Sequence, residues 1–420
     1  MASRTSDSGV ALQAAIDGNV RLLKKMASKV NLQEAKDAKG RNAHFAAAKG
    51  HLEVCRFLVE ESGFDVNSTT PHGSARALSV RFFPCRPSVL RYLLDHGGDP
   101  AVPDCRRSVP LHDAVEEGHC EVVRLLLSKG VDVDPINYVG TPLHLAASKD
   151  QDLAVKILLE HGADPNRVVN HVFSPLFMAA CCGQSLKCTK LLAETGADVN
   201  FTCPWGPIIL MEAVDDGLTE IVKFLLESGA DPNIANEDGK IPIMWAGGHG
   251  NRELVEILFP WTKPIPSIPD WSVDGILRAM KYLHLEAQDA ALVRERIADA
   301  KSHGKEAFAK GEYFAAVHYY GLALDKDPLD ATLFANLSLC WLRMSEGERA
   351  LADARKCKMM RPGWSKAWYR EGAALSFLMN YKGAVIAFMQ AQKLDPTSDE
   401  IKKALREAME AMRSAARSEQ

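Results

Sequence analysis

The sequence lacks the features that would assign it to a membrane, to a disulfide-bonded scaffold or to a metal site. It contains no apolar run of about 18 residues, and its first residues, MASRTSDSGV, lack the apolar core of a signal peptide. Its ten cysteines include no Cys-x-x-Cys pair. The group of Cys181, Cys182, Cys188 and Cys203 lacks both the usual zinc spacing and histidine partners. We therefore predict no membrane span, no metal, and reduced cysteines that serve as small apolar side chains in helix cores.

The sequence also lacks an excess of basic charge, and its charge is unevenly spread. The formal net charge is −4: residues 291–420 hold 21 Lys and Arg against 17 Asp and Glu, whereas the remainder holds 29 against 37. This acidic N-terminal part argues against nucleic acid as a partner, because nucleic-acid binding requires a basic surface. The sequence has no phosphate-binding loop, nucleophile motif or metal motif. We predict that it is not an enzyme, needs no cofactor and works in the cytoplasm, with the nucleus as an alternative.

What the sequence does contain, over residues 1–262, is a repeat of 32 to 34 residues marked by one small residue per unit. That column consists of Ala14, Ala46, Val80, Ala114, Ala146, Ala179, Ala213 and Ala246. Thr141-Pro142-Leu143-His144 precedes one of these alanines, and residues 162–166, 196–200 and 229–233 read GADPN, GADVN and GADPN. Thr followed by Pro favours the start of a helix, and Gly after a helix favours a left-handed stop.

These motifs resemble ankyrin repeats in about eight units, and the resemblance implies a solenoid of stacked helix pairs. One such unit cannot bury its own apolar face, so neighbouring units must stack. The third unit, around residues 75–99, is expected to be distorted, because Phe82-Phe83-Pro84 and Pro87 interrupt the places where two helices should run.

Residues 263–296 are predicted to form a Pro-rich linker and a connecting helix. Pro264, Pro266 and Pro269 disfavour a helix at the start of this segment. Asp270 or Ser272 is expected to cap the helix that follows. That helix could either plug the open end of the ankyrin stack or lean on the next domain, and the sequence leaves both open.

An ankyrin stack implies a protein partner bound at the exposed position of the inner helices. Counted from the column of small residues, that position is held by Phe45, Asp113, Leu145, Met178, Glu212 and Trp245. The functional hypothesis is an acidic surface with apolar anchors for a basic or amphipathic segment of an unidentified protein. The alternative is that the acids only solvate this face and that Trp245 belongs to the core of the last repeat. His112 and His144 are interpreted as structural, with rings that hydrogen-bond the backbone.

A second repeat, of 34 residues, occupies residues 297–398. Two columns define it: Ala316, Ala350 and Ala384, and Pro328, Pro362 and Pro396. Gly304 and Gly372 occupy equivalent places, with Ser338 between them. Each unit therefore predicts two amphipathic helices that cross at a small residue, and a proline that ends the second helix. The predicted units are 297–330, 331–364 and 365–398, and residues 399–420 are predicted to form a capping helix and tail.

This second repeat resembles the tetratricopeptide repeat (TPR), and more closely the chaperone-binding class of that family. The resemblance rests on Lys301-Ser-His-Gly-Lys305, Leu333-Phe-Ala-Asn336 and Trp364-Ser-Lys366-Ala-Trp-Tyr-Arg370. In that class a dicarboxylate clamp holds the C-terminal Glu-Glu-Val-Asp of cytosolic heat-shock chaperones. The five implied positions, here named the clamp residues, are Lys301, Lys305, Asn336, Lys366 and Arg370. Lys305 departs from the family, which has Asn there, so we expect altered peptide selectivity.

Together the two repeats predict an all-α fold: an N-terminal ankyrin-repeat solenoid joined by a Pro-rich linker to a three-repeat TPR superhelix with a C-terminal capping helix. The combination resembles plant ankyrin–TPR proteins. The resemblance implies a non-enzymatic adaptor or co-chaperone, whose TPR groove binds the tail of heat-shock protein 90 and/or 70 while the ankyrin repeats bind another protein. The alternative is a chaperone-independent scaffold whose TPR groove binds a different acidic peptide.

Overall fold

The computed structural model describes residues 7–32, 51–67, 87–104, 106–170, 172–203, 206–207, 209–236, 239–286 and 290–418. Within these residues the fold is all-α apart from one hairpin, in which β1 (Thr202–Cys203) pairs antiparallel with β2 (Gly206–Pro207). The chain divides into two units, residues 1–110 with 295–420, and residues 111–294. The predicted fold class is therefore confirmed.

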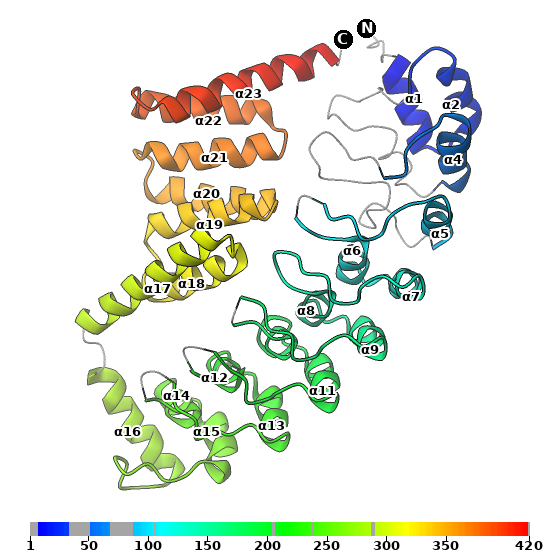
Figure 1. The fold of residues 1–420 in the computed structure, drawn as a ribbon. Coiled ribbons are helices and arrows are strands. Elements are labelled where there is room, and N and C mark those ends of the chain that lie inside the picture. The colour runs from blue at the N-terminus through cyan, green and yellow to red at the C-terminus, as the bar shows by residue number, and fades with distance from the viewer. Residues whose placement is uncertain are drawn as a thin grey trace. The chain divides into compact units, whose positions relative to one another are not determined.

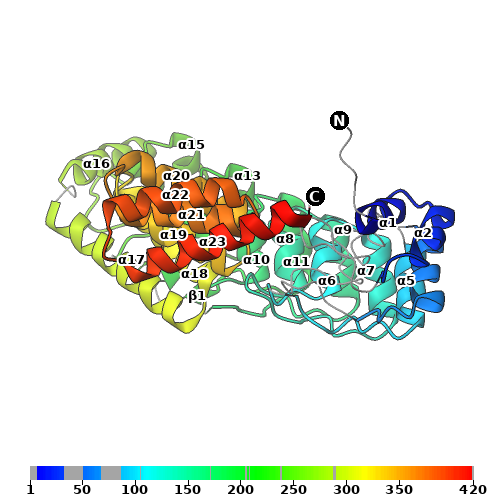
Figure 2. The same ribbon diagram turned by 90° about the horizontal axis from the view of Figure 1, so that it is seen from above.

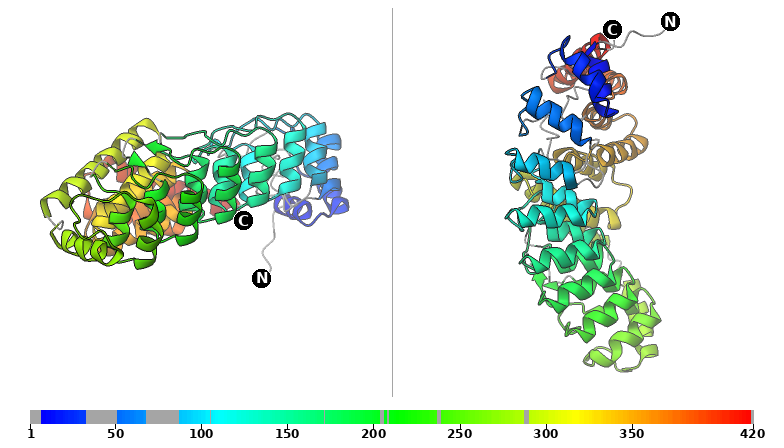
Figure 3. Two further views of the ribbon diagram at one scale, coloured as in Figure 1. Left: turned by 90° about the horizontal axis from the view of Figure 1, so that it is seen from below. Right: turned by 90° about the vertical axis from the view of Figure 1, so that its right-hand side faces the viewer.

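Short helices in pairs form the N-terminal repeats (Figure 1). Their bounds are α1 (Asp7–Ile16), α2 (Val20–Ala27), α4 (Leu52–Arg56) continued by η1 (Phe57–Glu61), α5 (Pro87–Asp95), α6 (Pro110–Glu116), α7 (Cys120–Ser128), α8 (Pro142–Ser148), α9 (Asp152–Glu160), α10 (Pro175–Phe177) continued by η3 (Met178–Cys182), α11 (Leu186–Glu194), α12 (Ile209–Asp215), α13 (Thr219–Glu227), α14 (Pro242–Gly248), α15 (Arg252–Leu258) and η4 (Phe259–Trp261). Figure 3 shows the pairs of residues 111–258 side by side in one row.

The predicted column of small residues lies where the paired helices meet. Its described members are at most 2% exposed, and they are Ala14, Ala114, Ala146, Ala179, Ala213 and Ala246. Ala46 and Val80 lie outside the described residues. A larger side chain in this column would hold neighbouring helices apart, which explains why the column is almost entirely alanine.

The start of α8 shows how the capping tetrapeptide works. His144 is fully buried, and its Nδ1 accepts hydrogen bonds from the backbone N–H of Thr141 (3.2 Å) and the Thr141 hydroxyl (2.8 Å). Because Nδ1 accepts, Nε2 carries the proton and donates to the Phe173 carbonyl of the next repeat (3.2 Å). His112 makes the equivalent contact with the Gly140 carbonyl (3.2 Å). The structural role predicted for both histidines is confirmed.

A ladder of asparagines ties successive repeats together. In each rung, the asparagine Oδ1 accepts from a backbone N–H of the next repeat. Its Nδ2 donates to the backbone carbonyl two residues before that N–H. Asn166, for example, donates to the Gly196 carbonyl (2.9 Å) and accepts from the Asp198 N–H (2.8 Å). The same pair of bonds is made by Asn67, Asn200 and Asn233. At each of these four junctions, one amide thus satisfies a backbone donor and a backbone acceptor.

In the repeat that contains α7, Asp134 occupies the asparagine position and makes an irregular rung. Its Oδ2 accepts from the Asp164 N–H (3.0 Å), as the asparagine oxygens do. Its Oδ1 is buried and has no hydrogen-bond partner in the described part of the chain. The register of the other rungs places this oxygen where an amide would donate to the Gly162 carbonyl. An acceptor therefore faces an acceptor at this rung.

The expected irregular third repeat lies mostly in residues 68–86, which include Phe82-Phe83-Pro84 and are outside the described residues. The described remainder corrects one expectation. Pro87 does not interrupt a helix; it is the first residue of α5, whose Val89 and Leu93 are buried. Proline is tolerated there because the N–H that it lacks would have no intrahelical acceptor.

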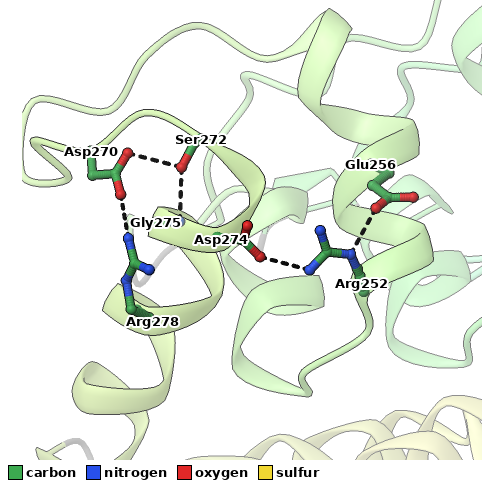
Figure 4. A network of polar contacts seen from close by, with 7 residues as sticks. All are labelled: Arg252, Glu256, Asp270, Ser272, Asp274, Gly275 and Arg278. Atoms are coloured by element: carbon green, nitrogen blue, oxygen red, sulfur yellow. Dashed lines mark hydrogen bonds and ion pairs between the residues drawn. The ribbon is translucent and has the colours of Figure 1, made fainter.

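The connecting helix, α16 (Val273–Glu286), packs against the last ankyrin pair, α14 and α15. Ile276 and Met280 are buried, so this helix covers the end of the stack, one of the two possibilities that the sequence left open. The Ser272 hydroxyl caps it by accepting the Gly275 N–H (3.0 Å), and Asp270 holds that hydroxyl (2.8 Å) (Figure 4). Arg252 of α15 donates to Asp274 (2.7 Å) and joins the two helices.

The C-terminal repeats are longer helix pairs, stacked in chain order (Figure 1). Their bounds are α17 (Ala290–Lys310), α18 (Tyr313–Lys326), α19 (Ala331–Arg343), α20 (Gly347–Met360), α21 (Ser365–Phe377), α22 (Tyr381–Leu394) and α23 (Asp399–Ser418). Figure 2 looks along this stack, so α18 to α23 overlie one another. The second helices end just before Pro328, Pro362 and Pro396, as predicted, and α23 packs on α22 and α21 as the capping helix.

Small residues allow the close helix crossings of these pairs. A Cβ on Gly304 would lie 2.6 Å from Cε1 of Tyr320, and one on Gly372 would lie 2.6 Å from Cδ1 of Phe388. In the middle pair Ser338 takes the equivalent place, and its buried hydroxyl donates to the Ala350 carbonyl (2.8 Å). These crossings confirm the prediction made from the sequence, and they fix how the first helix of each pair is presented.

Candidate functional site

The five clamp residues lie on the first helices of the three successive TPR-like pairs. Lys301 and Lys305 are on α17, Asn336 is on α19, and Lys366 and Arg370 are on α21. The helices α19 and α21 contact each other and enclose a core of Ala331, Ala335, Cys357 and Ala367. Ala335 and Ala367 directly precede and follow Asn336 and Lys366 in the chain, so these small side chains bring the two clamp positions close to the contact between the helices.

Arg370 is the most constrained of the five. Its Nε is buried and has no hydrogen-bond partner among the described residues. Burial lowers the pKa of the Arg370 guanidinium, although it remains a cation at neutral pH. Its guanidinium carbon lies 5.7 Å from the ring centre of Tyr369. A desolvated cationic donor without an acceptor is energetically costly, and an anionic ligand would supply the missing acceptor.

Lys366 lies one helical turn before Arg370, and the two charges interact. Burial lowers the pKa of Lys366, and the positive charge of Arg370 lowers it further. The Lys366 ammonium is 5.9 Å from the ring centre of Trp364. Two cations held close together favour a ligand with negative charge, because that ligand removes their repulsion.

Lys301 differs from the expectation, because an acid of the protein already binds it. Its Nζ is 2.5 Å from Oδ2 of Asp330, and the side chains are 29% and 10% exposed. Asp330 also caps α19: its Oδ1 accepts from the Thr332 N–H (2.8 Å) and from the Thr332 hydroxyl (2.6 Å). Burial alone would raise the pKa of Asp330, but the hydrogen bonds from Lys301 and Thr332 outweigh it and lower that pKa. Asp330 therefore stays ionised at neutral pH.

The buried thiol of Cys357 on α20 lies in the core between α19 and α21. Burial raises the pKa of Cys357 to about 11, and the charges of Arg370, Lys366 and Asp330 all act on it. Cys357 itself packs with Ala331 and Ala335 of α19 and with Ala367 of α21. Lys305 is exposed and Asn336 is half-buried. Neither makes a side-chain hydrogen bond within the described ranges, so both are available to a ligand.

Two further residues near the site were not anticipated from the sequence. The negative charge of the Glu400 carboxylate on α23 raises the pKa of both Lys366 and Arg370. Burial and this carboxylate raise the pKa of Tyr369 to about 12. Asp330 was recognisable as a helix cap, because Asp commonly precedes a helix. Its pairing with Lys301, 29 residues earlier, has no signal in a single sequence.

The proposed ankyrin surface needs correction. Asp113, Leu145 and Met178 were expected at an exposed position, but they are 2%, 5% and 1% exposed. Inner helices of successive repeats contact each other directly, α8 with α10 and η3, and η3 with α12, and the next repeat therefore covers this position. Glu212 and Trp245 are half-buried, and Phe45 lies outside the described residues. The Trp245 indole donates to Asp215 (2.5 Å), and Lys240 lies over its ring.

The described residues contain neither a candidate metal site nor a candidate membrane-spanning helix. No cluster of three or more histidine, cysteine, aspartate or glutamate side chains there is arranged to hold a metal ion. None of the helices described is both long and apolar enough to span a bilayer.

Comparison with known proteins supports both repeat regions. Sequence models described as ankyrin repeats match residues 43–71 and, in three overlapping copies, residues 80–265, together about half of the chain. The ankyrin repeat domain of Bcl-3 is 25% identical with a TM-score of 0.45, covering 59% of this chain and 97% of that one.

Two other relatives are not described as ankyrin-repeat proteins. A protein STIP1 homolog of Dictyostelium discoideum is 32% identical over 114 residues, which are 27% of this chain and 20% of that protein. An Hsp70-Hsp90 organizing protein of Triticum aestivum is 28% identical over 119 residues, 28% of this chain and 20% of that protein. The chain thus matches only about a fifth of the length of each. These similarities agree with the TPR-like helix pairs of the C-terminal part.

Proposed function

This chain belongs to the ankyrin-repeat proteins, and we propose that it is a non-enzymatic adaptor whose clamp residues bind the acidic C-terminus of a cytosolic heat-shock chaperone. The ankyrin stack would meanwhile bind a second protein, as in the plant ankyrin–TPR proteins that the sequence resembles. Similarity to Hsp70-Hsp90 organizing proteins supports chaperones as the class of partner. The proposal places the protein in the cytoplasm, where it would meet such chaperones.

The observation that carries this proposal is the buried Nε of Arg370, which lacks an acceptor in the described part of the chain. A peptide that ends in Asp presents two carboxylates a few ångströms apart, one on the main chain and one on the side chain. Arg370 offers a planar donor group and the neighbouring Lys366 a mobile ammonium, which together suit such a pair. A hydrogen bond to a charged group contributes about 1.5–3 kcal/mol, so a few would give roughly micromolar affinity.

A peptide titration by calorimetry tests this proposal. The probe is an acetylated peptide that ends in Glu-Glu-Val-Asp with a free C-terminus. Lys366→Glu/Arg370→Glu should abolish binding. Lys382→Glu/Lys393→Glu is the matched control, because it reverses two exposed charges on α22 and should leave the affinity unchanged. If both double variants bind like the wild type, the clamp residues do not form the binding site.

The alternative is a scaffold that binds a different acidic peptide, independent of chaperones. Two observations favour it: Lys305 stands where the chaperone-binding class has Asn, and Lys301 is already paired with Asp330. A pull-down from cytosol depleted of heat-shock chaperones separates the two. Partners that require Lys366 and Arg370 and persist after depletion would favour the alternative, whereas their loss would favour the chaperone adaptor.

A further inference from the structure

The Lys301–Asp330 pair changes the charge that a ligand would meet at the α17 side of the site. Asp330 lies at the start of α19 and is fixed by Thr332, so it does not have to be ordered when it binds Lys301. The pair is closed at 2.5 Å and mostly screened from solvent, with Asp330 only 10% exposed. A ligand carboxylate that approached Lys301 would have to displace a preorganised carboxylate of the protein itself.

The other cations of the site have no such partner. Lys305 is exposed and makes no ion pair within the described ranges, and it follows Lys301 by one helical turn, on the same face of α17. In the described part of the chain, no acid is hydrogen-bonded to Lys366 or Arg370. The negative charge of Glu400 nevertheless raises the pKa of both. Glu400 is exposed, so water and salt screen its effect.

We propose that Asp330 is a specificity-determining residue of this site: it withholds Lys301, so that Lys305, Lys366 and Arg370 bind the acidic C-terminal peptide. This inference rests on the proposed function and refines it. It assigns Lys301 a positioning role in place of the direct contact that the family resemblance implies. An intrinsic acid in the site also favours ligands whose acidic groups reach α21 over those that depend on the α17 side alone.

Asp330→Asn is the decisive variant, because Asn caps a helix about as well as Asp. The amide oxygen can still accept from the Thr332 N–H, so α19 should keep its start, and circular dichroism would verify this. Without the carboxylate, Lys301 is free to bind the peptide. The affinity for the free-acid Glu-Glu-Val-Asp peptide should rise about fivefold, in the range expected for one partly buried ion pair. The dissociation constant should also rise more steeply with salt.

A double-mutant cycle completes the test. Lys301→Ala alone should weaken binding, because it leaves the Asp330 carboxylate unpaired beside an acidic peptide. In the Asp330→Asn background, Lys301→Ala should remove the gain and restore the wild-type affinity. Lys305→Ala should weaken binding in both backgrounds. Asp325→Asn is the charge-matched control; it removes one exposed acid from α18 and should have no effect.

The outcomes separate the inference from the proposed function. Equal affinities of wild type and Asp330→Asn, or a Lys301→Ala/Asp330→Asn variant that binds much more weakly than the wild type, would overturn the role of Asp330 while leaving the binding site in place. Failure of every variant to bind the free-acid peptide would refute the proposed function, and the inference with it.

Discussion

Replacement of Asp134 by Asn should stabilise the ankyrin stack. Asp134 occupies an asparagine position in the ladder between repeats, and its Oδ1 is buried without a partner in the described residues. An Asn there would place Nδ2 opposite the Gly162 carbonyl, as Asn166 does opposite the Gly196 carbonyl at 2.9 Å. The bond that Asp134 already accepts from the Asp164 N–H would be kept by the amide oxygen.

The magnitude follows from two contributions. A new hydrogen bond contributes about 0.5–1.5 kcal/mol net, and removal of an unsatisfied buried acceptor contributes about 1–3 kcal/mol. Asp134 as a whole is half-buried, and solvent reduces both contributions. We expect an increase of about 1–2 kcal/mol in the free energy of unfolding at pH 7.

The pH dependence identifies the mechanism. Burial raises the pKa of Asp134 in the folded protein, and the nearby carboxylates of Asp164 and Asp132 raise it further. A carboxyl whose pKa is raised by folding destabilises the folded state above that pKa, and this penalty disappears as the pH falls through it. Once protonated, Asp134 can itself donate to the Gly162 carbonyl. The advantage of the Asn variant should therefore shrink as the pH is lowered towards 4.

Urea unfolding of the full chain at pH 7 and pH 4.5 measures both effects. Asp132→Asn is the control, because it removes an equal charge from the same loop, where Asp132 accepts from the Asp134 N–H (3.1 Å). If Asp132→Asn stabilises the protein as much as Asp134→Asn does, simple charge relief explains the gain. If Asp134→Asn is neutral at pH 7, the interpretation of the irregular rung is wrong.

The remaining predictions concern the two helix architectures and the site. Gly372→Ala should lower the free energy of unfolding by about 1–2 kcal/mol, because its Cβ would meet Phe388. Gly321→Ala in α18 is the control: its Cβ meets no atom within 4 Å, so it should be neutral or stabilising, and chemical denaturation of both variants tests this. Burial lowers the pKa of His144 to about 4, so the unfolded chain takes up the proton first and stability should fall by about 2 kcal/mol as pH drops from 7.5 to 5. His144→Gln should lack this part of the pH dependence in denaturant titrations, and an unchanged slope would contradict it. Asp330→Asn should tighten peptide binding about fivefold, as measured by calorimetry.

The repeat architecture was largely predictable, because stacking imposes the same local demand on every unit. Small residues such as Ala146 recur wherever helices cross closely, and prolines such as Pro362 recur where helices must end. His144 was recognisable as structural for the same reason: it stands in a tetrapeptide that both starts a helix and contacts the next repeat. Periodic sequence features therefore predicted these elements well.

Features that depend on one particular contact were not predictable. The prediction that Asp113, Leu145 and Met178 are exposed was wrong, because the angle between successive repeats decides which side chains the next helix covers. The expected interruption at Pro87 was wrong, because a single sequence does not show whether a proline stands at the start or in the middle of a helix. The pairing of Lys301 with Asp330 joins two helices, and neither residue is unusual in its own segment.

The central claim is that Arg370 and its neighbours bind the terminal carboxylates of a peptide. The most direct test compares the acetylated Glu-Glu-Val-Asp peptide with its C-terminal amide, both titrated into the full chain. The amide lacks one charged acceptor worth about 1.5–3 kcal/mol, so its dissociation constant should be roughly tenfold to a hundredfold larger. Equal dissociation constants for the acid and the amide would contradict the claim.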